Sequence, residues 1–164
     1  MTLAEIAIVM LLLVVAWRDV LTRNLPDGIA LALAAIGVGL RVSLGWSPLL
    51  LSLATAALLF MVLLALAMRG WLGGGDVKLA AALAIGLAPS ATLDFLLVTV
   101  LAGGVLGLGY MAGPHLVPRR IPALGGHGLR RVLAVEARRL RRGGPLPYAV
   151  AIAAGGILTH LARS

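Results

Sequence analysis

Apolar residues in this chain gather into six long runs, with short polar or glycine-rich segments between them. A helix needs ~20 apolar residues to cross a ~30 Å hydrocarbon core, and long apolar runs are typical of such helices. The pattern predicts an all-α polytopic membrane protein with about six transmembrane helices, at residues 3–17, 28–45, 47–68, 77–87, 91–113 and 145–161. No internal repeat is visible, so we expect residues 1–164 to form a single membrane-embedded domain.

The first run is slightly short for a span, and we expect its helix to continue through Arg18 and Asp19. Both side chains would then lie at the membrane surface or just beneath it. Pro26 disfavours a helical conformation at the residue before it, and Asp27 suits the N-cap of the next helix. For Asp27 we favour this capping role over a catalytic one.

The fourth run, residues 77–87, is too short to cross the membrane. One interpretation is that its helix extends past Pro89. The other is that the helix begins below the membrane surface, with Asp76 in a protein-lined cavity where irregular backbone is tolerated. We favour the second interpretation.

Composition supports the membrane assignment and excludes several kinds of chemistry. Of the 164 residues 61% are hydrophobic, and the mean hydropathy is +1.06. The chain has no cysteine, which excludes disulfides, zinc–thiolate sites and thiol nucleophiles. Its three histidines, His115, His127 and His160, lack ligand spacing, so we expect neither a metal nor a cofactor.

The net charge of +8 comes from arginines placed between the apolar runs, a pattern typical of cytoplasmic loops rather than of nucleic-acid binding. With six spans, 12 of the 14 basic residues fall on one side, which the positive-inside rule makes cytoplasmic; both termini would be periplasmic. Eight of these arginines lie in a loop at residues 115–144, between helices five and six. Part of this loop is either an amphipathic helix on anionic lipids or a disordered basic segment.

Two acidic stretches stand at the predicted cytoplasmic face. Residues 73–78 read Gly-Gly-Gly-Asp-Val-Lys, and residues 19–27 read Asp-Val-Leu-Thr-Arg-Asn-Leu-Pro-Asp. A glycine-rich turn with a solvated charge pair would explain the first stretch by itself. However, carboxylates near membrane depth are rare and usually face a protein interior or a wet cavity, so two such stretches favour a functional site.

Together these stretches resemble the motifs of the type IV prepilin peptidases, membrane aspartic proteases of the Gly-x-Gly-Asp type. A third stretch, residues 147–155, resembles the last helix of that family, although Ala149 stands where glycine is usual. The resemblance assigns catalysis to Asp19 and Asp76. It assigns supporting motif positions to Gly73, Gly75, Lys78, Pro26 and Asp27. For Lys78 two roles stay open, favouring the ionised form of Asp76 or binding lipid phosphate.

The resemblance also implies a location and a substrate. It implies a multi-pass protein of the bacterial inner membrane that removes the leader peptide of type IV prepilins or pseudopilins at the cytoplasmic face. Two carboxylates would share a proton and activate water, with no assignment of the proton to either one. Larger members carry a cysteine-containing domain that N-methylates the new terminus. This sequence resembles the short, peptidase-only members, which often serve Flp-type pili.

Other functions remain to be weighed. A small proton- or ion-coupled transporter or channel could use the same acidic residues, although no internal symmetry supports it. A structural membrane subunit of a secretion machine is a third hypothesis. The sequence leaves the oligomeric state open, a homo-oligomer included.

Overall fold

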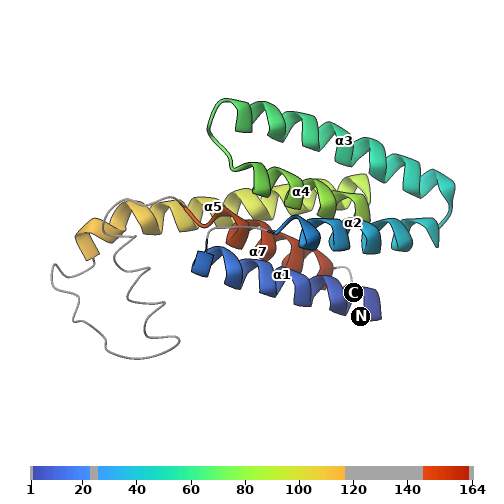
Figure 1. The fold of residues 1–164 in the computed structure, drawn as a ribbon, viewed down its shortest axis with the longest axis horizontal. Coiled ribbons are helices and arrows are strands. Elements are labelled where there is room, and N and C mark those ends of the chain that lie inside the picture. The colour runs from blue at the N-terminus through green and yellow to red at the C-terminus, as the bar shows by residue number, and fades with distance from the viewer. Residues whose placement is uncertain (1, 23–25, 117–145, 163–164) are drawn as a thin grey trace.

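The computed structural model describes residues 2–22, 26–116 and 146–162, and these form a bundle of helices (Figure 1). The all-α prediction is confirmed. The helices are α1 (Leu3–Thr22), α2 (Asp27–Val42), α3 (Trp46–Met68), α4 (Gly74–Gly86), α5 (Pro89–Leu116) and α7 (Tyr148–Leu161). The Arg-rich loop predicted between the last two lies outside the described residues.

Successive helices run in alternating directions, and both chain ends lie at the same end of the bundle (Figure 1). We call this end the terminal end. The opposite end, where α1 finishes and α4 and α7 begin, we call the site end. The alternation of the described helices agrees with the alternation predicted from the apolar runs.

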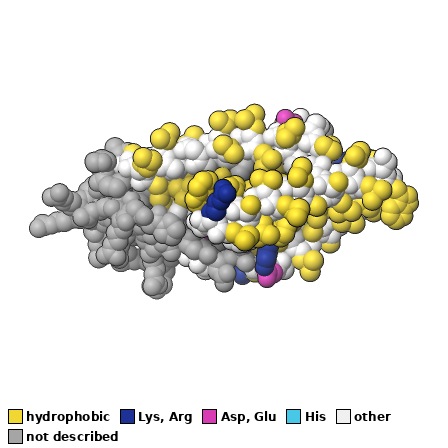
Figure 2. Space-filling model, turned by 90° about the horizontal axis from the view of Figure 1, so that it is seen from above, with side chains coloured by type: hydrophobic (Ala, Val, Ile, Leu, Met, Phe, Trp, Pro, Cys, Tyr) yellow, Lys and Arg dark blue, Asp and Glu magenta, His cyan; other side chains and the backbone are white. Residues whose placement is uncertain are grey.

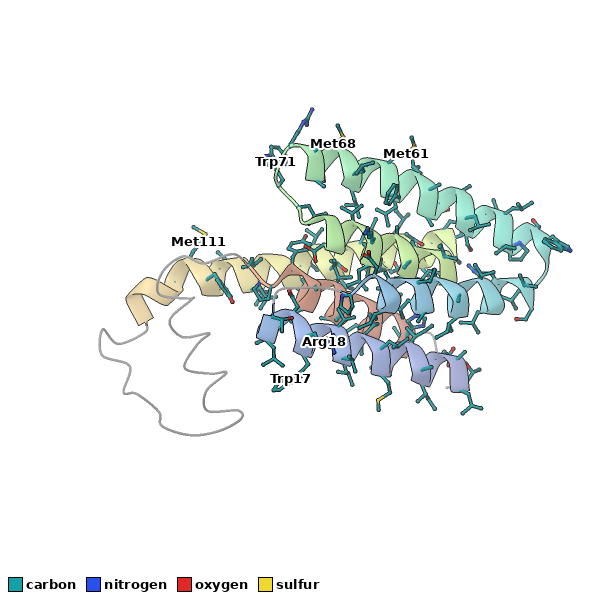
Figure 3. The ribbon with its side chains drawn as sticks, viewed as in Figure 1. Trp17, Arg18, Met61, Met68, Trp71 and Met111 are labelled. Carbon is teal, nitrogen blue, oxygen red and sulfur yellow. The ribbon has the colours of Figure 1, made fainter. Side chains whose placement is uncertain are left out.

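Two helices, α3 and the first 24 residues of α5, are long and apolar enough to cross a membrane. By the same criteria the other described helices are too short or too charged, so six spans remain a prediction. Large hydrophobic side chains cover much of the outer surface, as Figure 2 shows for one face. On α3 and α5, Met61, Met68 and Met111 point away from the bundle (Figure 3). An apolar exterior of this extent is typical of a protein in contact with lipid.

The end of α3 is fixed by Gly70, which adopts φ 77°, a conformation that favours glycine. Its backbone N–H donates to the Ala67 carbonyl at 2.9 Å, and the Trp71 N–H donates to the Leu66 carbonyl at 3.1 Å. These two bonds form a Schellman motif, which satisfies the last carbonyls of the helix and reverses the chain. Because the chain reverses here, the glycine stretch at residues 73–75 lies at the site end.

The helix α4 ends at Gly86, and α5 begins at Pro89, so the interpretation in which the fourth helix continues past Pro89 is wrong. Proline disfavours a helical conformation at the residue before it but fits the first position of a new helix. The carbonyl of Leu87, left over at this break, accepts a hydrogen bond of 2.8 Å from the buried Ser52 hydroxyl of α3. This bond ties the break to α3.

Glycines set the closest helix contacts. A Cβ at Gly37 of α2 would lie 2.8 Å from the backbone nitrogen of Gly86, and one at Gly156 of α7 would lie 2.8 Å from Leu12 Cδ1. Such contacts let backbones approach, as is common between membrane helices. As a result α7 is buried between α1, α4 and α5, and residues from all four helices share one core cluster.

Candidate active site

Asp19 lies on the buried face of α1. The buried residues of this helix are Ile8, Leu12, Val15 and Asp19, whose spacing of four, three and four places them on one stripe. Asp19 is only 6% exposed, and α1 packs this side against α7. The helix ends at Thr22, so its predicted continuation through Asp19 is confirmed. The carboxyl group therefore faces the protein interior, three residues from the end of the helix.

Asp76 is the third residue of α4, and its carboxylate turns back over the start of its own helix. A Cβ added at Gly73, the N-cap, would lie 2.9 Å from Asp76 Oδ2. The first glycine of the motif therefore leaves room for the carboxylate. The first backbone N–H groups of a helix lack partners within it and carry a partial positive charge. This is a favourable place for an ionised carboxylate.

The register of α3 and α4 sets the depth of Asp76. Ser52 of α3 and Leu87 stand at the same level, because they are hydrogen-bonded. From Ser52 to Met68, the last residue of α3, is 16 residues, whereas from Leu87 back to Asp76 is 11. The shorter of the two segments is therefore the one that leads to Asp76, in the first turn of α4. Asp76 is half-buried at the site end of the bundle.

Residues of the two motif helices line one small crevice at the site end. Val15 of α1 lies beside Gly75 and Leu79 of α4 around a small crevice. Asp19 is one helical turn beyond Val15, and Asp76 directly follows Gly75. The second motif glycine thus borders a crevice that Pro26 and Asp27 also line, and the two aspartates lie on separate helices at the site end.

Lys78 and Asp27 form an ion pair. Lys78 Nζ donates a hydrogen bond of 2.8 Å to Asp27 Oδ1, and the two side chains are 54% and 78% exposed. Asp27 is therefore not the N-cap of α2, and the capping prediction is wrong. The helix starts one residue earlier than predicted because Pro26, with φ −69° and ψ 131°, already occupies the N-cap, and α2 has no side-chain cap among the described residues.

The lysine is also not directed at Asp76. Two residues along a helix correspond to a rotation of about 200°, so Lys78 and Asp76 lie on nearly opposite sides of α4. Lys78 instead joins the second motif to the first, because Asp27 closes the Asp19–Asp27 stretch.

Tyr148 is a neighbour of the site that sequence reasoning did not single out. It is the first residue of α7, and its ring lies over Gly103 of α5, where an added Cβ would come within 3.1 Å of Tyr148 Cε2. Asp76 is near enough to act electrostatically on the Tyr148 hydroxyl. The sequence did hold a signal for this residue. Tyr148 is an aromatic residue with a hydroxyl group near the start of the apolar run at residues 145–161, on the same predicted side of the membrane as both aspartates. Within the described residues no three His, Cys, Asp or Glu side chains are grouped as metal ligands.

Comparison with known proteins gives two matches. The model of the type IV leader peptidase family matches residues 6–108, a range that includes both Asp19 and Asp76. The prepilin leader peptidase/N-methyltransferase of Bacillus subtilis (strain 168) is 31% identical over 159 residues, which cover 95% of this chain and 54% of that protein. The chain thus spans about half the length of this curated relative. No solved structure matches significantly.

Proposed function

Because the chain belongs to the type IV leader peptidase family, we propose that it is a membrane aspartic endopeptidase that removes the leader peptide of type IV prepilins. Asp19 and Asp76 are the proposed catalytic pair. The observation that carries this proposal is that the two aspartates, 57 positions apart in sequence, both stand at the site end, on α1 and α4, whose residues line one small crevice there.

The surroundings of the two carboxyl groups support different roles. Asp76 stands at the N-terminus of α4, where the helix dipole stabilises a negative charge. Asp19 is buried in the last turn of α1, where the helix dipole disfavours a negative charge. This asymmetry supports Asp76 as the ionised base and Asp19 as the protonated acid.

Peptide hydrolysis then needs no further cofactor. Asp76 takes a proton from a water molecule, whose oxygen attacks the scissile carbonyl carbon, while Asp19 gives its proton to the carbonyl oxygen. When the tetrahedral intermediate collapses, the C–N bond breaks and the leaving amine takes a proton from the pair. Tyr148 lies beside this site, but the proposal assigns it no proton.

The position of Asp76 fits a bond close to the membrane boundary. It lies in the first turn of α4, which begins at the site end, so a substrate would reach it from that end of the bundle. A peptide with an apolar segment in the membrane would present the bond before that segment at this depth.

We propose further that the site end faces the cytoplasm and both termini face the periplasm. By the spans predicted from the sequence, 12 of the 14 basic residues fall on that side. Tryptophans mark both ends of the bundle, as interfacial belts do: Trp17 and Trp71 are exposed toward the site end (Figure 3), and Trp46 at the terminal end.

These 164 residues are also proposed to cleave without N-methylating the product and to serve Flp-type pili. The absence of cysteine from this sequence supports the first point, and the short form that the sequence resembles supports the second.

The proposal is tested by co-expressing the chain with candidate prepilins and following leader removal by gel shift. Mass spectrometry of the mature pilin then gives the cleavage point and shows whether the new N-terminus is methylated. We expect a mature, unmethylated product. Full-length prepilin, at normal levels of inserted enzyme and with every candidate tested, would contradict the proposed function. Methylation by the purified chain would contradict only its last part.

A further inference from the structure

An apolar groove of about 670 Å³ lies on the side of α4 opposite to Asp76. Its walls are α2 and α3, and its floor is the stripe of α4 that contains Lys78, Ala81 and Ile85. Seven of its 13 lining residues are glycine or alanine, and its charged lining residues are Asp27 and Lys78. The groove is therefore apolar along its length, with the ion pair at its mouth on the site end.

The groove has a closed end. Three residues join α2 to α3 at the terminal end, and the two helices diverge toward the site end (Figure 1). Just beyond the last lining residues, Gly86 packs on Gly37, and Leu87 is hydrogen-bonded to Ser52. On each helix the lining residues span seven positions, so the groove is about 10 Å long.

These dimensions separate two kinds of occupant. At about 10 Å the groove is far shorter than the ~30 Å hydrocarbon core that a membrane-spanning helix crosses. A helix that crosses the membrane would also have to run past the closed end. Acyl chains are narrower and can end inside the groove.

The charges at the mouth indicate the head group. Lys78 and Asp27 present one cation and one anion, 2.8 Å apart and both exposed. A head group with a phosphate and a primary ammonium matches both, because Lys78 donates to the phosphate and the ammonium donates to Asp27. A purely anionic head group would be attracted by Lys78 but repelled by the negative charge of the Asp27 carboxylate.

We propose that this groove binds a zwitterionic phospholipid of the phosphatidylethanolamine type, with its acyl chains between α2 and α3 and its head group on the Asp27–Lys78 pair. The site is separate from Asp19 and Asp76, and the proposal does not depend on peptidase activity.

The test uses the full 164-residue chain, reconstituted with equal amounts of phosphatidylethanolamine and phosphatidylglycerol that carry the same acyl chains. Native mass spectrometry after mild detergent extraction measures the lipid retained. We expect about threefold more phosphatidylethanolamine than phosphatidylglycerol, the scale of an exposed ion pair. Lys78→Gln and Asp27→Asn should each bring the ratio close to one.

A second test fills the groove with a large side chain and compares this variant with one that carries the same substitution outside the groove. Ala57 of α3 lines the groove, whereas Ala54, three residues earlier, is also exposed but lies outside it. Ala57→Phe should lower retention about tenfold, equivalent to removing roughly two methylene groups from apolar contact, and Ala54→Phe should leave it unchanged. Both positions are exposed, so both variants should fold; a circular dichroism spectrum checks this.

Three results would overturn the proposal. They are equal retention of the two lipids by the unmodified chain, equal retention by the two phenylalanine variants, and occupation of the groove by a substrate's apolar segment instead of lipid. Cross-linking from a photoreactive residue at position 57 to a co-expressed prepilin would reveal the last of these.

Discussion

Lys78 Nζ lies 2.8 Å from Asp27 Oδ1, so the lysine of the Gly-x-Gly-Asp-x-Lys motif binds the last residue of the Asp19–Asp27 stretch rather than its own aspartate. The two motifs are thus joined across α2 and α4 on the side of α4 that faces away from Asp76. This arrangement separates the catalytic proposal from the charge pair, and it makes the two experimentally distinguishable.

The first prediction concerns this pair. Asp27→Asn and Lys78→Gln should each lower the stability of the detergent-solubilised protein by at most about 1 kcal/mol, because both side chains are more than half exposed. Leader cleavage should largely persist in Asp27→Asn. Thermal unfolding and the gel-shift assay measure the two effects. Abolished cleavage in a stable Asp27→Asn protein would instead place Asp27 in the catalytic machinery.

The second prediction concerns the first motif glycine. In Gly73→Ala the new methyl group would come within 2.9 Å of Asp76 Oδ2, and the flexible carboxylate, rather than the backbone, would move. Cleavage should fall tenfold or more, because misplacing a reacting group by about 1 Å has effects of this size or larger, while stability changes little. Gly74→Ala is the control, since nothing lies within 4 Å of its added Cβ. Equal activity of the two variants would show that the carboxylate does not act from the observed position.

The third prediction concerns the contact of α2 with α4. Gly37→Ala would put a methyl group 2.8 Å from the backbone of Gly86, where no flexible side chain can yield, and should destabilise the protein by about 1–3 kcal/mol. Gly39→Ala, on the same helix with nothing within 4 Å, should be neutral or slightly stabilising. Thermal unfolding in one detergent compares them directly. If the unfolding temperature of Gly37→Ala is not lower than that of Gly39→Ala, the close crossing of α2 and α4 is not present in solution.

The sequence predicted the helices well because apolar run length and proline are local signals. The predicted continuation of α1 through Asp19 was confirmed, and so was an all-α chain. Local signals also gave the motif residues of the site. They did not give the partner of Lys78, because a contact across 51 positions depends on how α2 packs against α4. Tyr148 was missed for the same reason, since it lies beside Asp76 only through the packing of α7.

The fourth prediction concerns topology. A reporter inserted near position 126 should report the cytoplasm, and one fused after Ser164 should report the periplasm, because 12 of the 14 basic residues fall on the proposed cytoplasmic side. Paired phosphatase and fluorescent-protein fusions measure this. A cytoplasmic signal from both sites would mean that one helix does not cross, with the 13-residue α4 the first to be re-examined.

The central claim is tested most directly by leader cleavage in Asp19→Asn, Asp76→Asn and the double variant, each at a normal level of membrane insertion. We expect each single variant to abolish cleavage and the double variant to be little worse, because residues that act as one catalytic unit are not additive. Asp94→Asn, at an exposed carboxylate on α5, should cleave normally. Substantial cleavage by well-inserted Asp76→Asn would contradict the aspartic-peptidase mechanism and favour an ion- or proton-coupled transporter.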